Sequence, residues 1–223
     1  MMKHNNKNTS MNKLETQSYE AQAARWPSQG KHILAHYDQE SVIVYQAYRE
    51  SIGRYAAQHG RFGGPDFSFS RMSWIKPNFL WMMYRSGWGT KPGQEVVLAL
   101  RLSRSFFESL LEKAVPSTFV PSMYPSEEAW QADVAASDVR MQWDPDHAPD
   151  GSKLERRAIQ LGLRGAALKA MAGDELLEVI DVSPFIAEQR RFIHSAAHYA
   201  ELQTPVETVF EPQSVLARRR AWG

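Results

Sequence analysis

Cationic and aromatic side chains are concentrated in one stretch of the sequence, residues 71–88. Lys76 and Arg85 lie there among several tryptophan, tyrosine and phenylalanine residues, and Arg157 is a further cation later in the chain. Lysine and arginine bind phosphate, and aromatic rings stack on the flat faces of bases. The stretch therefore indicates a binding site for an anionic, aromatic ligand.

The elements that would position these groups begin with a short helix over residues 78–86. Pro77 suits the first turn of a helix and Gly87 the position just past its end. Because the helix is apolar on every side, we expect its residues to be largely buried and Arg85 to be carried into or beside the interior. Arg85 then either pairs with a carboxylate or helix-end carbonyl for structural reasons or meets a ligand.

The composition is that of one globular domain. The chain has 223 residues, 43% hydrophobic and 23% charged, with 26 Lys and Arg against 25 Asp and Glu. This balance excludes a strong overall attraction to nucleic acid or anionic lipid, so nucleic-acid binding needs a local patch. The sequence has no cysteine and no apolar run long enough to cross a membrane, and we expect a cytoplasmic location without membrane attachment.

Strands and helices are expected to mix without strict alternation, which predicts an α+β fold with a central mixed or antiparallel sheet and packed helices. Residues 41–48 are a predicted strand covered on both faces, because β-branched residues occupy both of its sides. Gln46 within it either bonds backbone at the strand end or, with Tyr45 and Tyr48, lines a ligand cleft. The remaining expected elements are helices over 33–38, 49–59, 105–111, 127–136, 166–172 and a long one from 183, and strands over 70–75, 95–102, 139–143, 157–163 and 175–182.

The two ends differ from the middle in composition. Residues 1–29 are rich in Asn, Lys, Ser and Gln and are predicted to be a disordered tail. Residues 30–203 form the predicted domain, and 204–223 are expected to be an extended, basic tail that ends in three arginines.

Metal binding has weak support in the sequence. His32 with His36, and His194 with His198, have the spacing that puts two imidazoles on one helical face. Neither pair has an acidic third ligand nearby, and Asp144-Pro145-Asp146-His147 has the composition of a plain turn. We expect no metal site.

Several segments together resemble one uncharacterised family, the domain of unknown function DUF4291. They are Val44-Tyr45-Gln46-Ala47-Tyr48, residues 72–88, Lys91-Pro92-Gly93-Gln94-Glu95, residues 139–144 and Ile159-Gln160-Leu161-Gly162-Leu163. The resemblance covers the chain from about Lys31 to Pro184. It implies no activity, and His32 and His36 depart from the family pattern.

The expected order of elements also resembles the ADP-ribosyltransferase fold. The resemblance places Tyr45 and Gln46 on the first strand of the site, Ser73 before the Trp81 helix and Gln160 on the late strand. That strand carries a catalytic Glu in the family. Gln160 can hydrogen-bond a ribose but cannot act as a carboxylate, so transfer chemistry would need Glu95 or another acid nearby.

These observations predict a pocket that binds a nucleotide such as NAD. Its expected catalytic residues are Gln160 and Glu95, and its expected ligand-binding residues are Tyr45, Gln46, Tyr48, Ser73, Lys76, Trp81, Arg85, Trp88 and Arg157. The alternative is a non-enzymatic module for nucleic acid or a protein partner. In that case Trp74, Trp88, Lys91 and Arg71 form an exposed platform. The exposure of Trp74 and Trp88 separates the two hypotheses.

Overall fold

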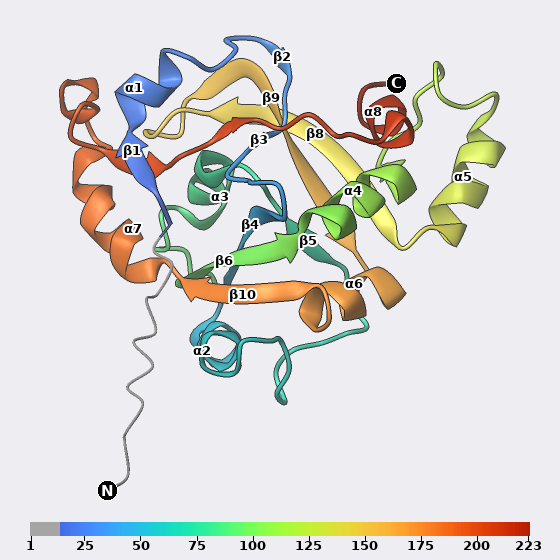
Figure 1. Ribbon diagram of the computed structural model, residues 1–223, viewed down its shortest axis with the longest axis horizontal. Coiled ribbons are helices and arrows are strands. Elements are labelled where there is room, and N and C mark those ends of the chain that lie inside the picture. The colour runs from blue at the N-terminus through green and yellow to red at the C-terminus, as the bar shows by residue number, and fades with distance from the viewer. Residues whose placement is uncertain (1–13) are drawn as a thin grey trace, which may run out of the picture.

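The computed structural model describes residues 14–223, which form helices and short strands arranged as an α+β fold (Figure 1). The helices are α1 (Tyr19–Ala23), α2 (Glu50–His59), α3 (Phe79–Ser86), α4 (Arg104–Lys113), α5 (Glu127–Ala136), α6 (Gly165–Ala172), α7 (Ser183–Gln189) and α8 (Val215–Trp222), with short 3-10 helices at Arg190–Phe192 and Ala196–His198. The strands are β1 (Thr16–Ser18), β2 (Gly30–Lys31), β3 (Leu34–Ala35), β4 (Ser41–Tyr48), β5 (Ser73–Ile75), β6 (Val96–Ser103), β7 (Val115–Pro116), β8 (Val139–His147), β9 (Lys153–Leu163), β10 (Leu176–Asp181), β11 (Gln203–Pro205) and β12 (Thr208–Val209). Within this part of the chain no helix is both long and apolar enough to cross a membrane.

A three-stranded antiparallel sheet in the order β10-β6-β4 separates two hydrophobic cores. Successive side chains of a strand point to opposite faces, so Val42 and Val44 enter one core while Ile43 and Tyr45 enter the other. Strand β6 alternates in the same way. The predicted strand over 41–48, covered on both faces, is therefore confirmed.

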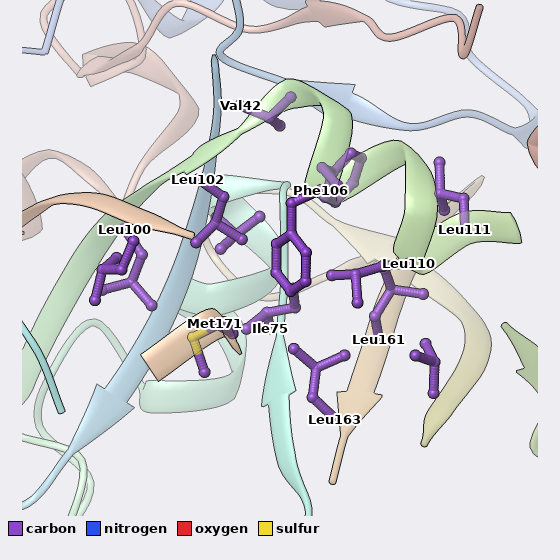
Figure 2. Close-up of a cluster of buried hydrophobic side chains, with 14 of the residues drawn as sticks. Val42, Ile75, Leu100, Leu102, Phe106, Leu110, Leu111, Leu161, Leu163 and Met171 are labelled. Atoms are coloured by element: carbon purple, nitrogen blue, oxygen red, sulfur yellow. The ribbon is translucent and has the colours of Figure 1, made fainter. Parts of the chain in front are cut away.

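The first core fills the space between this sheet and the second one (Figure 2). Figure 2 shows side chains from β4 and β6 facing others from α4, β5, β9 and α6. They include Val42, Leu100, Leu102, Phe106, Leu110, Leu111, Ile75, Leu161, Leu163 and Met171.

The second sheet is organised around the long strand β9. One edge of β9 pairs antiparallel with β8, which in turn pairs parallel with β7. The other edge is shared: β2 pairs with Arg156 and Arg157, and β5 pairs with residues 161–163. The segment 158–160 between them has no strand on that side among the described residues.

The two sheets meet at one pair of residues, Tyr45 on β4 and Lys76 just after β5. The Tyr45 N–H donates to the Lys76 carbonyl at 2.7 Å, and the Lys76 N–H donates to the Tyr45 carbonyl at 3.2 Å. This bridge fixes where β5 ends and where α3 begins.

Helix α3 is the predicted central helix and lies in the second core. Asn78 caps it, because its side chain accepts a hydrogen bond from the Trp81 N–H, and Gly87 ends it in a left-handed conformation. Phe79, Leu80 and Met83 are at most 2% exposed, and each such burial contributes about 1.5–3 kcal/mol. Two expectations for this helix were wrong, because Tyr84 and Arg85 are exposed at its surface.

The described part of the predicted N-terminal tail is folded, which corrects the expectation for residues 14–29; residues 1–13 lie outside the described part. Strand β1 pairs with β11 near the other end of the chain, and the two run side by side in Figure 1. The fully buried Gln22 donates to Thr204 Oγ1 at 2.9 Å and accepts from the Glu207 N–H at 2.8 Å. Glu207 in turn accepts from the Phe79 N–H at 2.7 Å, at the first turn of α3.

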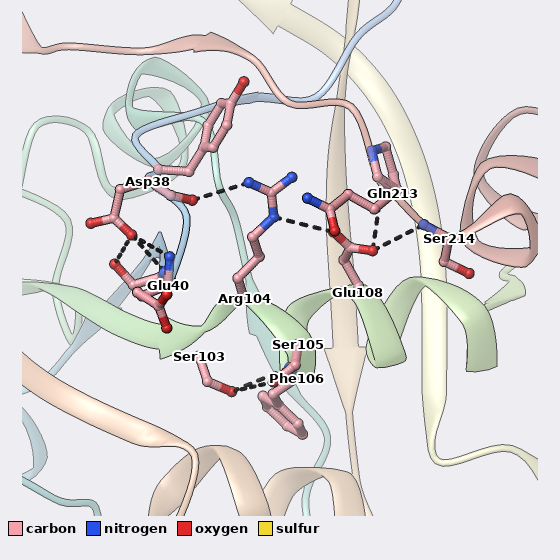
Figure 3. A network of polar contacts seen from close by, with 12 residues as sticks. Asp38, Glu40, Ser103, Arg104, Ser105, Phe106, Glu108, Gln213 and Ser214 are labelled. Carbon is pink, nitrogen blue, oxygen red and sulfur yellow. Dashed lines mark hydrogen bonds and ion pairs between the residues drawn. The ribbon is translucent and has the colours of Figure 1, made fainter.

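The predicted C-terminal tail is also folded. It forms β11, β12 and α8, and Glu108 of α4 anchors the start of α8 by accepting from the backbone N–H groups of Gln213 and Ser214, each at 3.1 Å (Figure 3). Glu108 also accepts from Arg104, whose guanidinium donates to the Asp38 carbonyl. Ser103 caps α4 by accepting from the Phe106 N–H.

Three further local expectations differ from the structure. Residues 34–35 form a strand rather than part of a helix, because they pair with Thr208 and Val209. The segment 144–147 continues β8 instead of turning, since β9 pairs with it. Helix α7 ends at Gln189, and His194 lies outside a helix, so the premise that each histidine pair shares one helical face was wrong.

Glu207 offers a test of how the ends hold α3. Burial raises the pKa of its carboxyl well above the ordinary value, so the unfolded chain ionises at a lower pH than the native one. Native stability should therefore fall as the pH rises from about 4.5, a loss that Glu207→Gln abolishes while keeping an oxygen for the Phe79 N–H. In urea melts near neutral pH the Gln variant should be at least as stable as the wild type.

The comparison variant is Glu207→Ala. It leaves the Phe79 N–H without a partner and should cost about 1–3 kcal/mol. Equal stability of the Ala and Gln variants would contradict a capping role.

Candidate functional site

A cleft of about 770 Å³ opens beside the joint between the two sheets. Six of the predicted site residues line it, contributed by β4, β5, the segment before α3, α3 itself and β9. They are Gln46, Tyr48, Ser73, Lys76, Arg85 and Gln160.

Three side chains on β4 and β5 form a continuous hydrogen-bonded network on one wall. Gln46 donates to Ser73 Oγ at 2.8 Å and to the Trp74 carbonyl at 3.3 Å. The Tyr48 hydroxyl lies 2.6 Å from Ser73 Oγ and 3.2 Å from Gln46 Oε1. Burial raises the pKa of Tyr48 to about 12, so its hydroxyl stays protonated at neutral pH.

Two amides and a carboxylate form a second polar group on β8 and β9. Gln142 Nε2 donates to Asp144 Oδ1 and Gln160 Nε2 donates to Asp144 Oδ2, each at 2.8 Å. Both amides line the cleft. Because each uses one N–H on Asp144, each keeps its amide oxygen and a second N–H for other partners.

Cations dominate the charge of the cleft. Arg49 is paired with Asp66 at 3.3 Å, and both are largely exposed. Arg71, Lys76 and Arg85 also line the cleft, but within residues 14–223 no carboxylate lies within ion-pair distance of them.

Lys76 is the most unusual of these cations because it is only 4% exposed. Burial, and secondarily the charge of Arg85, lower the pKa of its amine from 10.5 to about 8, although Asp144 acts in the opposite direction. Its ammonium forms no hydrogen bond with any residue in the described range, and its nitrogen opens to the cleft.

The other five predicted residues lie away from the cleft lining. Tyr45 is fully buried in the second core, and its hydroxyl has no partner among the described residues. Arg157 on β9 is exposed and donates to the carbonyl of Trp143 on the neighbouring strand β8 at 2.9 Å. Glu95 is exposed on the loop before β6 and accepts from the Gly93 N–H.

The two predicted stacking tryptophans are core residues. Trp88 is 5% exposed, packs edge-on against Phe79 and donates to the Pro149 carbonyl at 3.0 Å. Trp81 is 7% exposed and stacks on His147, with Tyr84 covering the histidine ring from outside. The burial of Trp88 removes it from any exposed platform, and Trp74 lines the concave cleft.

The stack at His147 was not predicted. Its ring is 2% exposed, and neither nitrogen has a partner in the described part of the chain. Burial lowers the pKa of the imidazole, so a neutral ring is favoured. His36, by contrast, contacts the Val206 carbonyl, and the described residues contain no cluster of three or more His, Asp or Glu suited to a metal.

Trp74 reaches the cleft because β9 has a glycine beside it. Gly162 pairs with Trp74, and a Cβ at this position would lie 2.6 Å from Met72 Sδ and 2.9 Å from the Trp74 ring. Any larger residue would displace both side chains from the cleft wall.

Sequence reasoning missed Gln142, Asp144 and Arg49 as parts of this region. Gln142 alternates with buried Met141 on β8, which is the pattern of a half-exposed strand, and it pairs with Gln160 in register. Arg71 had been assigned to the alternative platform. The sequence does hold a signal for Gln142. Residues 139–143 and 157–163 were both predicted strands, and pairing them as neighbours would have placed Gln142 beside Gln160.

The family model for a domain of unknown function, DUF4291, matches residues 32–210. The chain belongs to the DUF4291 family. A search of curated proteins finds no match. The family match includes the cleft and every strand of the two sheets except β2, whereas β1, α1, β2 and α8 lie outside it.

Lys76 provides a test of the electrostatics of the cleft. The drop in the pKa of Lys76 from 10.5 to about 8 lowers the free energy of unfolding at neutral pH by about 3 kcal/mol. Lys76→Met should therefore stabilise the protein at pH 7, by up to that amount. Because the unfolded chain binds more protons than the native one between about pH 8 and 10.5, the wild type should regain stability there and the advantage of Met should shrink.

Urea melts of both proteins across this pH range measure the difference. Lys91→Met, at an exposed lysine near the end of α3, is the control and should show no comparable pH-dependent gain. A difference for Lys76→Met that stays constant with pH would contradict the prediction.

Proposed function

We propose that the cleft binds a nucleotide through its phosphate groups, with NAD as the candidate ligand. The observation that carries the proposal is the set of three cations, Arg71, Lys76 and Arg85, that line one concave site without carboxylate partners in residues 14–223. Placing three like charges around one cleft is unfavourable unless an anion compensates them. Phosphate oxygens are suitable acceptors for guanidinium and ammonium groups.

The uncharged groups of the cleft support a nucleotide over a simple anion. Gln142 and Gln160 retain amide groups that can hydrogen-bond ribose hydroxyls or a base edge. Trp74 offers an aromatic face on the wall of the cleft. A cavity of about 770 Å³ is within the range that holds a ligand of nucleotide size.

Transfer of ADP-ribose is the reaction that the resemblance to ADP-ribosyltransferases suggests. Glu95 lies outside the cleft lining, where it caps its own loop. Asp144, the carboxylate that contacts Gln160, is not a lining residue either, and we assign it the role of orienting the Gln142 and Gln160 amides toward the ligand. A strand of nucleic acid, the alternative partner, would use the same cations for its phosphates.

Replacement of one cleft arginine tests the proposal against a matched exposed arginine. Arg85→Met should weaken nucleotide binding about 10- to 100-fold, as the loss of a charge-assisted hydrogen bond does. Arg157→Met, outside the cleft, should leave affinity within about twofold. A thermal-shift screen of NAD, ATP and short RNAs, followed by calorimetric titration, supplies the affinities.

Gln160→Leu examines the other side of the cleft. Asp144 keeps its hydrogen bond from Gln142, so the variant should fold with nearly unchanged melting temperature and bind the nucleotide more weakly. Binding that is equally affected by Arg85→Met and Arg157→Met, or the absence of binding by all three ligand classes, would reject the proposed function.

A further inference from the structure

Lys76 lacks the contacts that usually explain a buried lysine. Lysine is almost never fully buried unless it is paired, and here the side chain is 4% exposed. Within residues 14–223 its ammonium has no ion pair and no hydrogen bond, and its nitrogen is not fully covered by protein but opens to the cleft. Its backbone, in contrast, is fixed by both hydrogen bonds to Tyr45. The position is therefore held rigidly while the amine is left without a structural partner.

The surroundings of this amine favour its neutral form. Burial is the larger cause and the Arg85 charge on α3 the second, and together they bring the pKa of Lys76 to about 8, against the opposing charge of Asp144 on β8. At pH 7 about a tenth of the protein then carries a neutral amine, a fraction more than a hundred times that of an ordinary exposed lysine. Desolvation and a neighbouring cation are the two means by which proteins activate lysine as a nucleophile.

We propose that Lys76 is a nucleophile that condenses with the carbonyl group of a phosphorylated aldehyde or ketone bound in the cleft. The neutral Nζ attacks the carbonyl carbon, a C–N bond forms, and the electron pair of the C=O bond moves to oxygen. Transfer of a proton from nitrogen to that oxygen gives a carbinolamine. Protonation of its hydroxyl and loss of water give a protonated imine, and hydrolysis reverses the sequence without any oxidant or reductant.

The groups around Lys76 fit the two ends of such a ligand. Arg71 and Arg85 line the same cleft and can bind its phosphate, so the inference rests on the phosphate-binding role proposed above. Asp144 acts on Lys76 electrostatically and can stabilise the positive charge of the imine. Gln142 and Gln160 line the same cleft, and each keeps a second amide N–H that can donate to the oxygen that develops charge in the carbinolamine.

Reductive trapping tests the inference in the full-length protein. Pyridoxal 5′-phosphate serves as the phosphorylated aldehyde, and cyanoborohydride reduces any imine to a stable amine whose position is found by peptide mass spectrometry. At pH 7 Lys76 should be labelled at least about tenfold faster than the exposed Lys91, because far more of its amine is neutral. Pyridoxal without phosphate should label Lys76 much more slowly, since it lacks the group that Arg71 and Arg85 bind.

The matched variant is Lys76→Arg, which keeps a positive charge but cannot form an imine under these conditions. Its circular dichroism and melting curve report folding, and the rapid label should be lost from the intact mass. Labelling of Lys91 with no label at Lys76, or an unchanged rapid label in the Arg variant, would overturn the inference.

The two proposals fail in different ways. Nucleotide binding that is sensitive to Arg85→Met, combined with no label at Lys76, rejects the covalent role and keeps the proposed function. Rapid phosphate-dependent labelling of Lys76 in a protein that binds no nucleotide does the reverse.

Discussion

The backbone bridge between Tyr45 and Lys76 is the constraint on which the rest of the structure depends. It joins a sheet whose two faces are both buried to a second sheet organised around β9. The residues on either side of the bridge point in different directions: the Tyr45 ring enters the core, while Lys76 lines the cleft. The cleft exists at this place because two independently paired sheets leave room beside their only backbone joint in the described chain, and the same joint forces an amine into a partly dry site.

The elements that could be predicted were those with strong local signals. Residues 41–48 were predicted to be a strand covered on both faces, and α3 was placed between Pro77 and Gly87, because alternation and helix-end residues are local signals. Pro77 itself precedes the Asn78 cap and does not occupy the first turn, as had been expected. The ends of the chain were misread for the opposite reason. Gln22 looks like one polar residue among many, and only its contact with Thr204 and Glu207, far away in the sequence, reveals a buried hydrogen-bond network.

The residues of the candidate site also divide into those that the sequence identified correctly and those that it did not. Gln46, Ser73 and Gln160 were selected from element order and Lys76 for its charge, and all four line one cleft. Trp81 and Trp88 were selected for their chemistry alone, and a large aromatic ring is as well suited to a core as to a ligand. Asp144 was overlooked because Pro145 beside it signals a turn, whereas pairing with Ala158 keeps it in the strand. Residue type therefore identified the polar residues that line the cleft, but it could not distinguish aromatic residues on the cleft wall from aromatic residues in the core.

The dependence of α3 on Glu207 has a consequence for how the protein is made. Synthesis proceeds from the N-terminus, so α3 leaves the ribosome more than a hundred residues before the carboxyl that contacts the Phe79 N–H. Until then the first turn of the helix, and Gln22 with it, must remain hydrated or find temporary partners. The second core can therefore close only late in translation, and a nascent chain arrested before Glu207 would expose an unusually apolar helix, which makes it a natural substrate for chaperones.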